Sequence, residues 1–506
     1  MGTIGRRARE LAVPVVVCAL TLGVYCLFSV GQWRMMASPS WDLAIFTEAA
    51  KSYSQGHWPI VPIKGPGFNL LGDHFHPILV LLGPVYRVFP SGLTLLIVQN
   101  VLLAWSAWPV TRAATRLAGS AGGLVIGLAY GLGWGLQGAV GAQFHEIAFA
   151  VPMLAHGGVA FAQGRYRACM AWLAPLVLVK EDLGLTIMVA GLVLAWRRRD
   201  QGRRALAESL AFAAFGAVAF VITTQVLLPA LNPAGTWAYS LDGSATGAGS
   251  SAGGAAAAKV WPSLIEILTF PSVKIATVLV CVLGAGVVGA ASPWFALVVP
   301  TLAWRFMGSV DFYYGWSSWH YNAVLVPIAS AALLDVLGRA AQWRDRRSAD
   351  EDRALADEAG AAAWRAERLS SWWGTGVISV GVATPLLALA ATAPLLPMWQ
   401  LTSSGFGQDG PRAEAAHQAM AAVPAGSAVE TDITLMARMV PDHEVYWVGS
   451  AKDMDPLPEY VVVDQRSYVW GGRDVTAVGW ATDAHPGHSY ELVFERNGFQ
   501  VARRTS

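Results

Sequence analysis

Long apolar runs separated by short basic clusters are the feature that most constrains how this chain can fold. Several runs approach the roughly 20 residues that a helix needs to cross a bilayer, and they recur through the first 400 residues. A membrane β-barrel would show alternating apolar and polar positions instead. Only 14% of the residues are charged, whereas soluble domains have about 25%. We therefore predict an all-α polytopic membrane bundle.

The apolar runs predict about 11 transmembrane helices. The segment from His76 to Phe89 is apolar but short and contains Pro84 and Arg87, so we interpret it as an interfacial helix. The predicted spans are Leu11–Val30, Leu93–Val110, Gly122–Val140, Ile147–Ala162, Ala168–Val179, Leu183–Trp196, Leu206–Leu228, Val273–Ala291, Trp294–Phe306, Tyr321–Leu337 and Gly374–Leu396.

Arginine clusters predict the orientation of this bundle in a plasma membrane. Arg6, Arg7 and Arg9 precede the first run, and Arg197 to Arg199 follow the sixth. Cytoplasmic loops of membrane proteins are enriched in Lys and Arg, so the N-terminus is predicted to be cytoplasmic. With that assignment every basic cluster lies inside, and the chain after the last span is extracytoplasmic.

The chain is predicted to divide into two domains. Residues 1–400 form the transmembrane domain, with an external loop at 31–92 and a charged, helical cytoplasmic segment at 339–371. Residues 232–258 are rich in Gly, Ala and Ser and predict a flexible external loop. Residues 410–506 predict a small extracytoplasmic α/β domain. Its predicted elements are a helix at Ala413–Ala422 and strands at Ser427–Glu430, Val445–Val448, Tyr460–Val463 and Tyr490–Phe494.

Several function classes find no support in the sequence. The net charge is +1 and no basic cluster is interleaved with aromatic residues, so no nucleic acid partner is expected. Motifs of P-loop nucleotide hydrolases, serine hydrolases and zincin proteases are missing from the sequence. The four cysteines lie inside apolar runs without metal-ligand spacing, so we interpret them as small buried hydrophobes.

Ionisable residues gather where the predicted spans end on the outer side. Such residues near a bilayer are costly and usually face a cavity or a partner, so one outer cavity would explain them all. Asp42 is the candidate catalytic base for an acceptor hydroxyl, and Lys180 and the histidines are candidate donors to a departing phosphate. Asp42, His76, His145 and Glu146 are candidates to hold a divalent cation. The candidate substrate-binding residues are His74, His76, His145, Glu146, Lys180, Glu181, Asp182, His320 and Tyr321.

Each candidate also has a structural interpretation that the sequence leaves open. Asp42 would serve as an N-cap, because Asp is favoured there and a helical run follows. The pair His74 and His76 would be part of an interfacial loop, and His145-Glu146 would anchor a span end. The charged run from Lys180 to Asp182 would be a solvated turn. The aromatic residues Tyr313, Tyr314, Trp316, Trp319 and Tyr321 would form an interfacial belt.

Four motifs carry a resemblance to a known class of proteins. They are W-D-L-A-I-F from Trp41, G-D-H-F-H-P-I from Gly72, F-H-E-I-A-F-A-V-P from Phe144 and V-K-E-D-L-G-L from Val179. Together they resemble a bacterial family of predicted membrane proteins of unknown function, grouped with the GT-C class of membrane glycosyltransferases. The resemblance covers residues 42–334, with a weaker echo in the tail at 460–464 and 498–504.

The resemblance implies a GT-C-like fold and a lipid-linked donor. GT-C enzymes transfer sugar from a polyprenyl phosphate or diphosphate on the external face of the membrane. Their acidic residue in the first external loop acts on the acceptor or on a bound metal, and here the matching residue is Asp42. Many members of the wider class have adjacent acidic residues at this place, whereas Asp42 is followed by Leu43. This departure argues against a metal site built from two carboxylates.

Three functions compete at this point. The leading hypothesis is a glycosyltransferase that uses a polyprenyl-phosphate-type sugar donor and an envelope acceptor, with membrane lipid as its surroundings. A transporter or flippase of a lipid-linked precursor would use the same charges along a substrate path, although the sequence shows no internal repeat. A non-catalytic envelope-assembly protein would use the external tail domain to bind a partner.

Overall fold

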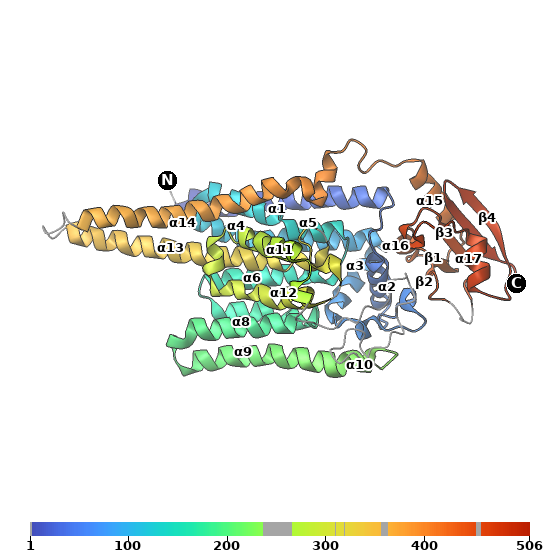
Figure 1. Cartoon of the computed structure of the whole chain (residues 1–506), viewed down its shortest axis with the longest axis horizontal. Helices are drawn as coiled ribbons and strands as arrows, with labels where there is room; N and C mark the ends of the chain where they lie inside the picture. Colours follow the sequence, from blue (N-terminus) through green and yellow to red (C-terminus); the bar gives the residue numbers. More distant parts are fainter. Residues whose placement is uncertain (1–2, 236–265, 309, 318, 356–362, 452–456) are drawn as a thin grey trace.

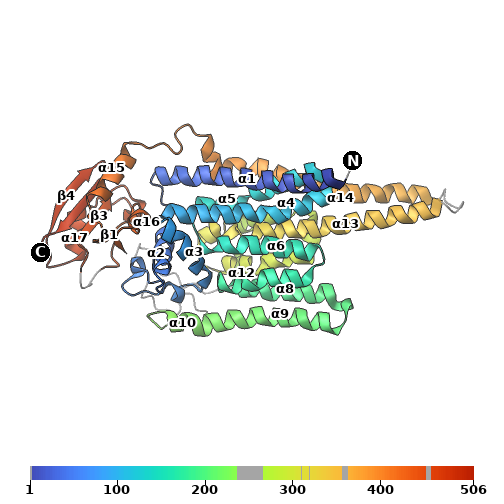
Figure 2. The same ribbon diagram turned by 180° about the vertical axis from the view of Figure 1, so that it is seen from behind.

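The protein is an elongated helical bundle with a small sheet domain at one end, as seen in a computed structural model (Figure 1). The structure describes residues 3–235, 266–308, 310–317, 319–355, 363–451 and 457–506. Most of the predicted loop at 232–258 therefore lies outside the described residues. The sheet lies at one end of the bundle, and α13 (Leu325–Leu355) and α14 (Ala363–Thr392) project beyond the other end (Figures 1 and 2).

Among the described residues, five helical segments are long and apolar enough to cross a membrane. Shorter apolar helices pack between them, so the prediction of a polytopic helical membrane protein is confirmed. The five segments are Glu10–Arg34, Gly92–Gly141, Arg203–Leu231, His320–Arg344 and Gly376–Leu395. The other bundle helices are α6 (Ala150–Ala162), α7 (Tyr166–Leu173), α8 (Leu183–Arg198), α11 (Pro271–Gly284) and α12 (Val298–Met307).

The second and third predicted spans form a tight hairpin. Both lie in α4 (Gly92–Gly131), whose backbone turns at Gly119 with a φ of +72° that glycine adopts without strain. A Cβ atom at Gly123 would collide with Thr115, and one at Gly127 would collide with Thr111. The two halves of α4 therefore approach through small residues, as membrane helices commonly do. The rest of the predicted third span is a separate helix, α5 (Trp134–Gly141).

The first loop between spans is largely helical and sits on the bundle. After α1 (Thr3–Arg34), α2 (Asp42–Ser54) buries nearly all of its first eight residues, so it packs inside the protein on every side. The predicted interfacial helix is a 3₁₀ segment at Pro77–Leu81 followed by α3 (Leu82–Val88). Gly83 allows α3 to approach the backbone of Tyr53 at the end of α2.

The C-terminal domain is a five-stranded sheet with strand order β2-β1-β3-β5-β4. The strands β1 (Ala428–Thr431), β2 (Glu444–Trp447) and β3 (Tyr460–Asp464) are parallel, and β4 (Tyr490–Arg496) and β5 (Phe499–Arg504) form an antiparallel hairpin. The four predicted strands and the predicted helix, α15 (Pro411–Ala421), are confirmed. The prediction missed β5, although Asn497-Gly498 is a typical hairpin turn and both residues have positive φ.

Two cations hold the C-terminal domain on α1 and on α2, which follows it. The Lys51 amine of α2 donates to the carbonyls of Val440 and His443 at 2.6 and 2.9 Å. Arg438, in α16 (Met436–Met439), donates to the carbonyl of Trp33 at 2.9 Å and lies 4.3 Å from its ring centroid. The domain therefore has a defined position on the bundle, which determines what its strand ends face.

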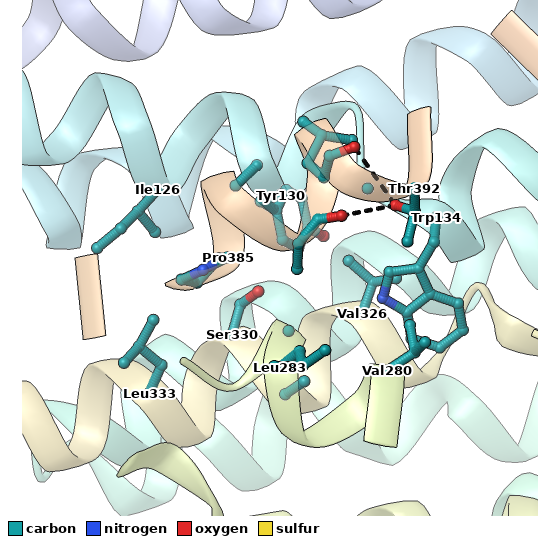
Figure 3. Close-up of a pocket in the computed structure, with 16 residues that line it drawn as sticks. Ile126, Tyr130, Trp134, Val280, Leu283, Val326, Ser330, Leu333, Pro385 and Thr392 are labelled. Carbon is teal, nitrogen blue, oxygen red and sulfur yellow. Dashed lines mark hydrogen bonds between the residues drawn. The ribbon is translucent and has the colours of Figure 1, made fainter. Parts of the chain in front are cut away.

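A small cavity within the bundle is too small to hold a substrate (Figure 3). It measures about 30 Å³ between α4, α11, α13 and α14, and apolar side chains such as Ile126, Leu283 and Leu333 line it. The Thr392 hydroxyl at its edge donates to the carbonyl of Ala388 at 2.8 Å. This volume holds about one or two water molecules, so we interpret the cavity as a packing gap.

Candidate functional site

One large cavity lies between the bundle, the segment from Pro39 to His76 and the C-terminal domain. Its volume is about 800 Å³. The residues selected from the sequence lie around it, and their chemical roles stay predictions. All ten predicted site residues line it: Asp42, His74, His76, His145, Glu146, Lys180, Glu181, Asp182, His320 and Tyr321.

Asp42 begins α2 with its carboxylate open to this cavity. The N-cap position belongs to Trp41, whose side chain makes no capping bond, so the interpretation of Asp42 as an N-cap is wrong. The Asp42 side chain is 30% exposed, and its Oδ2 lies 3.4 Å from Nε2 of His145. Burial alone would raise the pKa of Asp42, but His145, Ser40 and Lys64 lower it to about 2. The carboxylate is therefore ionised at neutral pH.

His145 is held in one orientation by the turn that precedes α6. Its Nδ1 lies 3.2 Å from the carbonyl of Gln143, and its backbone N–H donates to Oε1 of Gln99 at 3.1 Å. A carbonyl only accepts, so Nδ1 carries the proton and Nε2 faces Asp42. Gln143 has a φ of +72°, which is uncommon outside glycine and is a feature of strained functional turns.

A second histidine stacks on the first. The rings of His145 and His320 are 3.6 Å apart between centroids and are inclined by 22°. Burial lowers the pKa of the His320 imidazole, and the neighbouring His145 and Lys180 lower it further. Among the described residues Nδ1 of His320 is buried without a hydrogen-bond partner, and the preceding Trp319 has a φ of +63°. The chain thus accepts backbone strain on the approach to each ring.

The charged run before α8 is largely shielded from solvent, with Glu181 buried, so its interpretation as a solvated turn is wrong. The Lys180 amine lies 2.8 Å from Oε1 of Glu146, whose side chain is buried, and the Lys180 side chain is 13% exposed. Burial would lower the pKa of Lys180, but the charge of Glu146 raises it overall. Burial and Glu181 raise the pKa of Asp182 to about 6 against the opposing charge of Lys180. The segment that carries His74 contacts this turn through Glu181.

The two histidines between α2 and α3 have different environments. Nδ1 of His74 lies 2.7 Å from Oε1 of Glu181, whose other oxygen accepts from the backbone of Phe75 at 3.1 Å. Burial opposes a charge on His74, yet Glu181 raises its pKa overall. His76 is buried, its Nδ1 has no hydrogen-bond partner among the described residues, and burial lowers its pKa to about 4. The pKa values of the two imidazoles are therefore shifted in opposite directions.

The candidate metal ligands are not gathered as a metal centre. In the described parts of the chain, no group of three or more His, Cys, Asp or Glu side chains is arranged to hold a metal. The physical reason is that Glu146 is neutralised by Lys180, and that His145 is stacked on His320 with Nδ1 directed to a carbonyl. A role of Asp42, His76, His145 and Glu146 as metal ligands therefore stays a prediction.

The structure adds site residues that the sequence analysis did not select. Lys64 pairs with Asp73 at 2.5 Å and lies 5.6 Å from the ring centroid of Trp41, all three at the cavity. The charges of Lys64 and Asp73, in the loop after the first span, were a sequence signal that could have identified them as site residues. Trp447 and Tyr468 of the C-terminal domain also line the cavity, and no local pattern marks them.

The aromatic segment before α13 also contributes to the cavity. Tyr313, Trp319 and Tyr321 line it, so the belt interpretation is wrong for these three. The buried guanidinium of Arg305 holds this segment, donating to the carbonyls of Tyr313 and Gly315 at 2.7 and 2.9 Å. This packing directs the aromatic side chains inward.

The match to a family of proteins agrees with the sequence resemblance. The family described as predicted membrane protein (DUF2079) matches residues 33–501. No curated protein matches the chain. Among solved structures, the chain is similar to the crystal structure of ArnT from Cupriavidus metallidurans in the apo state, with 14% identity and a TM-score of 0.44 over 96% of this chain and 97% of that one.

Proposed function

The chain belongs to the DUF2079 family of predicted membrane proteins, and from that premise we propose that it is a membrane glycosyltransferase of the GT-C type. It transfers a sugar from a polyprenyl-phosphate-type donor to an envelope acceptor on the outer face. The observation that carries this proposal is the cavity itself. One ionised carboxylate, Asp42, faces a cluster of histidines and lysines there, next to apolar walls from the bundle.

The apolar walls support a donor with a lipid tail. Leu185 of α8, Phe220 of α9 (Arg203–Ile222) and Pro300, Ala303 and Met307 of α12 line the bundle side of the cavity. Apolar side chains on membrane helices offer a polyprenyl chain the same environment as the bilayer. A soluble nucleotide sugar would gain nothing from this wall.

The cations support a phosphate leaving group. His74 and Lys180 lie on the same cavity, and each is next to a buried carboxylate that raises its pKa. Fixed cations in a site with little water stabilise charge that develops on a departing phosphate. Because His76 is neutral, it is available as a further hydrogen-bonding group.

Asp42 is proposed to act on the acceptor hydroxyl. The hydroxyl oxygen forms a bond to the anomeric carbon, the bond from that carbon to the phosphate oxygen breaks, and the phosphate keeps the electron pair. The hydroxyl proton passes to Asp42. A pKa of about 2 makes Asp42 a weak base. It therefore orients the hydroxyl first and takes the proton only after the new bond is well formed.

A reconstituted assay tests the proposal. Purified full-length protein in vesicles is incubated with radiolabelled polyprenyl-phosphate sugars and an envelope extract from cells that lack the chain, which supplies unmodified acceptor. We expect label to move from the lipid to the extract. Label that crosses the vesicle unchanged would indicate a transporter, and label that does neither would indicate an assembly protein. Either result overturns the glycosyltransferase.

The proposal also requires the cavity to face outward. Ser404, between the last bundle helix and the C-terminal domain, and Gln201, between α8 and α9, are exposed at opposite ends of the bundle. In intact cells, a membrane-impermeant thiol reagent is expected to label Ser404→Cys and not Gln201→Cys. The opposite labelling would show that the cavity faces the cytoplasm. It would contradict the proposal that the reaction occurs on the outer face.

A further inference from the structure

The carboxyl ends of three strands form the roof of the large cavity. Ile433 follows β1, Trp447 ends β2, and Tyr468 and Val469 follow β3, and all four line the cavity. Because these strands are parallel, their carboxyl ends share one edge of the sheet. Ligands of open α/β sheets bind outside this edge. Figure 1 shows the same end of the sheet beside α2, which begins with Asp42.

The roof is fixed by direct contacts with the outer loop. The Tyr468 hydroxyl donates to the carbonyl of Pro39 at 3.0 Å, and the Trp41 and Trp447 rings meet edge to face at 5.6 Å. These contacts add to the clamps made by Lys51 and Arg438. The roof is therefore a preformed wall of the site, in contrast to a freely moving domain.

Trp447 has an unused hydrogen-bond donor at this wall. Its side chain is almost fully buried, with a relative exposure of 5%, and its Nε1 has no partner among the described residues. A buried donor without a partner is costly to the fold. An oxygen atom of a bound molecule would recover that cost. Tryptophan and tyrosine side chains also offer flat apolar faces.

The cavity has two chemically different walls that would suit two different substrates. The apolar wall that suits a lipid tail comes from α8, α9 and α12, whereas the roof comes from the C-terminal domain outside the bundle. Burial and the charge of Asp42 raise the pKa of Tyr468, so the roof lies within electrostatic reach of that carboxylate. A second substrate held at the roof would present a hydroxyl to Asp42 from the side opposite the lipid.

We propose that the C-terminal domain binds the acceptor through Trp447 and Tyr468. This inference rests on the proposed function. The acceptor is a glycan or a similar polyhydroxylated molecule. Its hydroxyl oxygens accept from the Trp447 indole, and its C–H faces pack on the Tyr468 ring. A purely apolar acceptor would leave the indole N–H without a partner.

The test compares two products of the assay described above. The label that reaches the envelope extract is divided by the label released to water as free sugar. Trp447→Phe keeps an aromatic ring and removes the donor, so we expect this ratio to fall by about 2- to 12-fold, the range of one hydrogen bond. Tyr468→Ala is expected to lower the ratio, while Tyr468→Phe keeps the ring and retains most of it.

Trp58→Ala is the matched control, because Trp58 is 64% exposed and lies away from the cavity lining. An unchanged ratio in Trp447→Phe and Tyr468→Ala overturns the inference. Transfer of the labelled sugar to an acceptor lipid that carries no glycan also overturns it. If Trp447→Phe does not fold, as judged by its melting, the Tyr468 pair decides. If the wild-type protein makes neither product, the proposed glycosyltransferase function is wrong. Failure of that function can therefore be distinguished from failure of the acceptor-binding inference.

Discussion

Two buried charge networks in this protein differ in how completely they are satisfied. Within the helical bundle, the inner network centres on Asp335 of α13, which accepts from Arg197, from the Ser292 hydroxyl at 2.6 Å and from Arg339 at 2.9 Å. At the large cavity, Nδ1 of His320 and Oδ1 of Asp182 are buried without partners among the described residues. The carboxylate of the inner network is saturated, whereas the cavity network keeps donors and acceptors without partners.

The difference separates structural charges from chemical ones. A buried ion pair with all its hydrogen bonds made has nothing left to offer a ligand, and it fixes how helices meet. Unpartnered polar atoms beside an 800 Å³ cavity are costly unless a substrate completes them. We therefore expect substitutions at the inner network to change stability and substitutions at the cavity to change activity.

Among the predicted variants, Asp42→Asn is expected to have the largest effect on transfer. An unchanged transfer rate would contradict the distinction between structural and chemical charges. Asn is nearly the same size but takes up no proton at neutral pH, so transfer should fall by about 10²- to 10⁴-fold. The melting temperature should fall modestly, because His145, Ser40 and Lys64 stabilise the carboxylate in the folded protein and lower its pKa to about 2. Initial rates of label transfer and a thermal melt measure both. Full activity in this variant would remove Asp42 from the chemistry.

Asp335→Ala tests the other side of the comparison. Removing the carboxylate leaves Arg197 and Arg339 without their shared partner, and breaking a buried pair costs about 3–5 kcal/mol. A clear fall in melting temperature is expected, with normal transfer by the protein that stays folded. Loss of transfer in well-folded Asp335→Ala would show that the inner network also serves the reaction.

The pair of Lys180 and Glu146 lies between the two classes, and a double-mutant cycle sharpens its assignment. Lys180→Met alone leaves Glu146 buried and unpaired, so stability and transfer should both fall. Adding Glu146→Gln removes that charge and should restore stability, with a coupling of about 0.5–3 kcal/mol. Transfer should stay low because the cation for the phosphate is still missing. Recovery of transfer in the double variant would make the pair structural.

Asp182→Asn is expected to give the smallest effect, visible only through pH. Burial raises the pKa of Asp182 from its ordinary value of 3.8 to about 6, so the folded state binds the proton more tightly than the unfolded state. Stability from this group is present below about pH 4 and is lost as the pH rises through about 6. The variant stays neutral, so it should melt a few degrees above the wild type near pH 8 and alike near pH 4. The exposed Asp200→Asn is the control, with no expected change.

Local patterns explain why much of the architecture was predictable. Apolar runs of bilayer length identify membrane helices, and alternation with turn residues identified four of the five strands. The hairpin turn at Asn497-Gly498 was also a readable signal for β5. The span boundaries were less predictable, because Gly119 and Gly133 divide apolar sequence into separate helices through backbone geometry.

The sequence by itself determined a helical membrane protein with a small α/β tail, and it determined that ionisable residues gather at one set of span ends. Hydrophobic periodicity and the cost of charge in a bilayer are local properties of each segment. Only the tertiary structure decided that His145 stacks on His320 and that Glu146 pairs with Lys180. It also decided that Trp447 and Asp42 line the same cavity. These partners are far apart in the chain, and their pairing depends on how the helices and the sheet domain pack against one another.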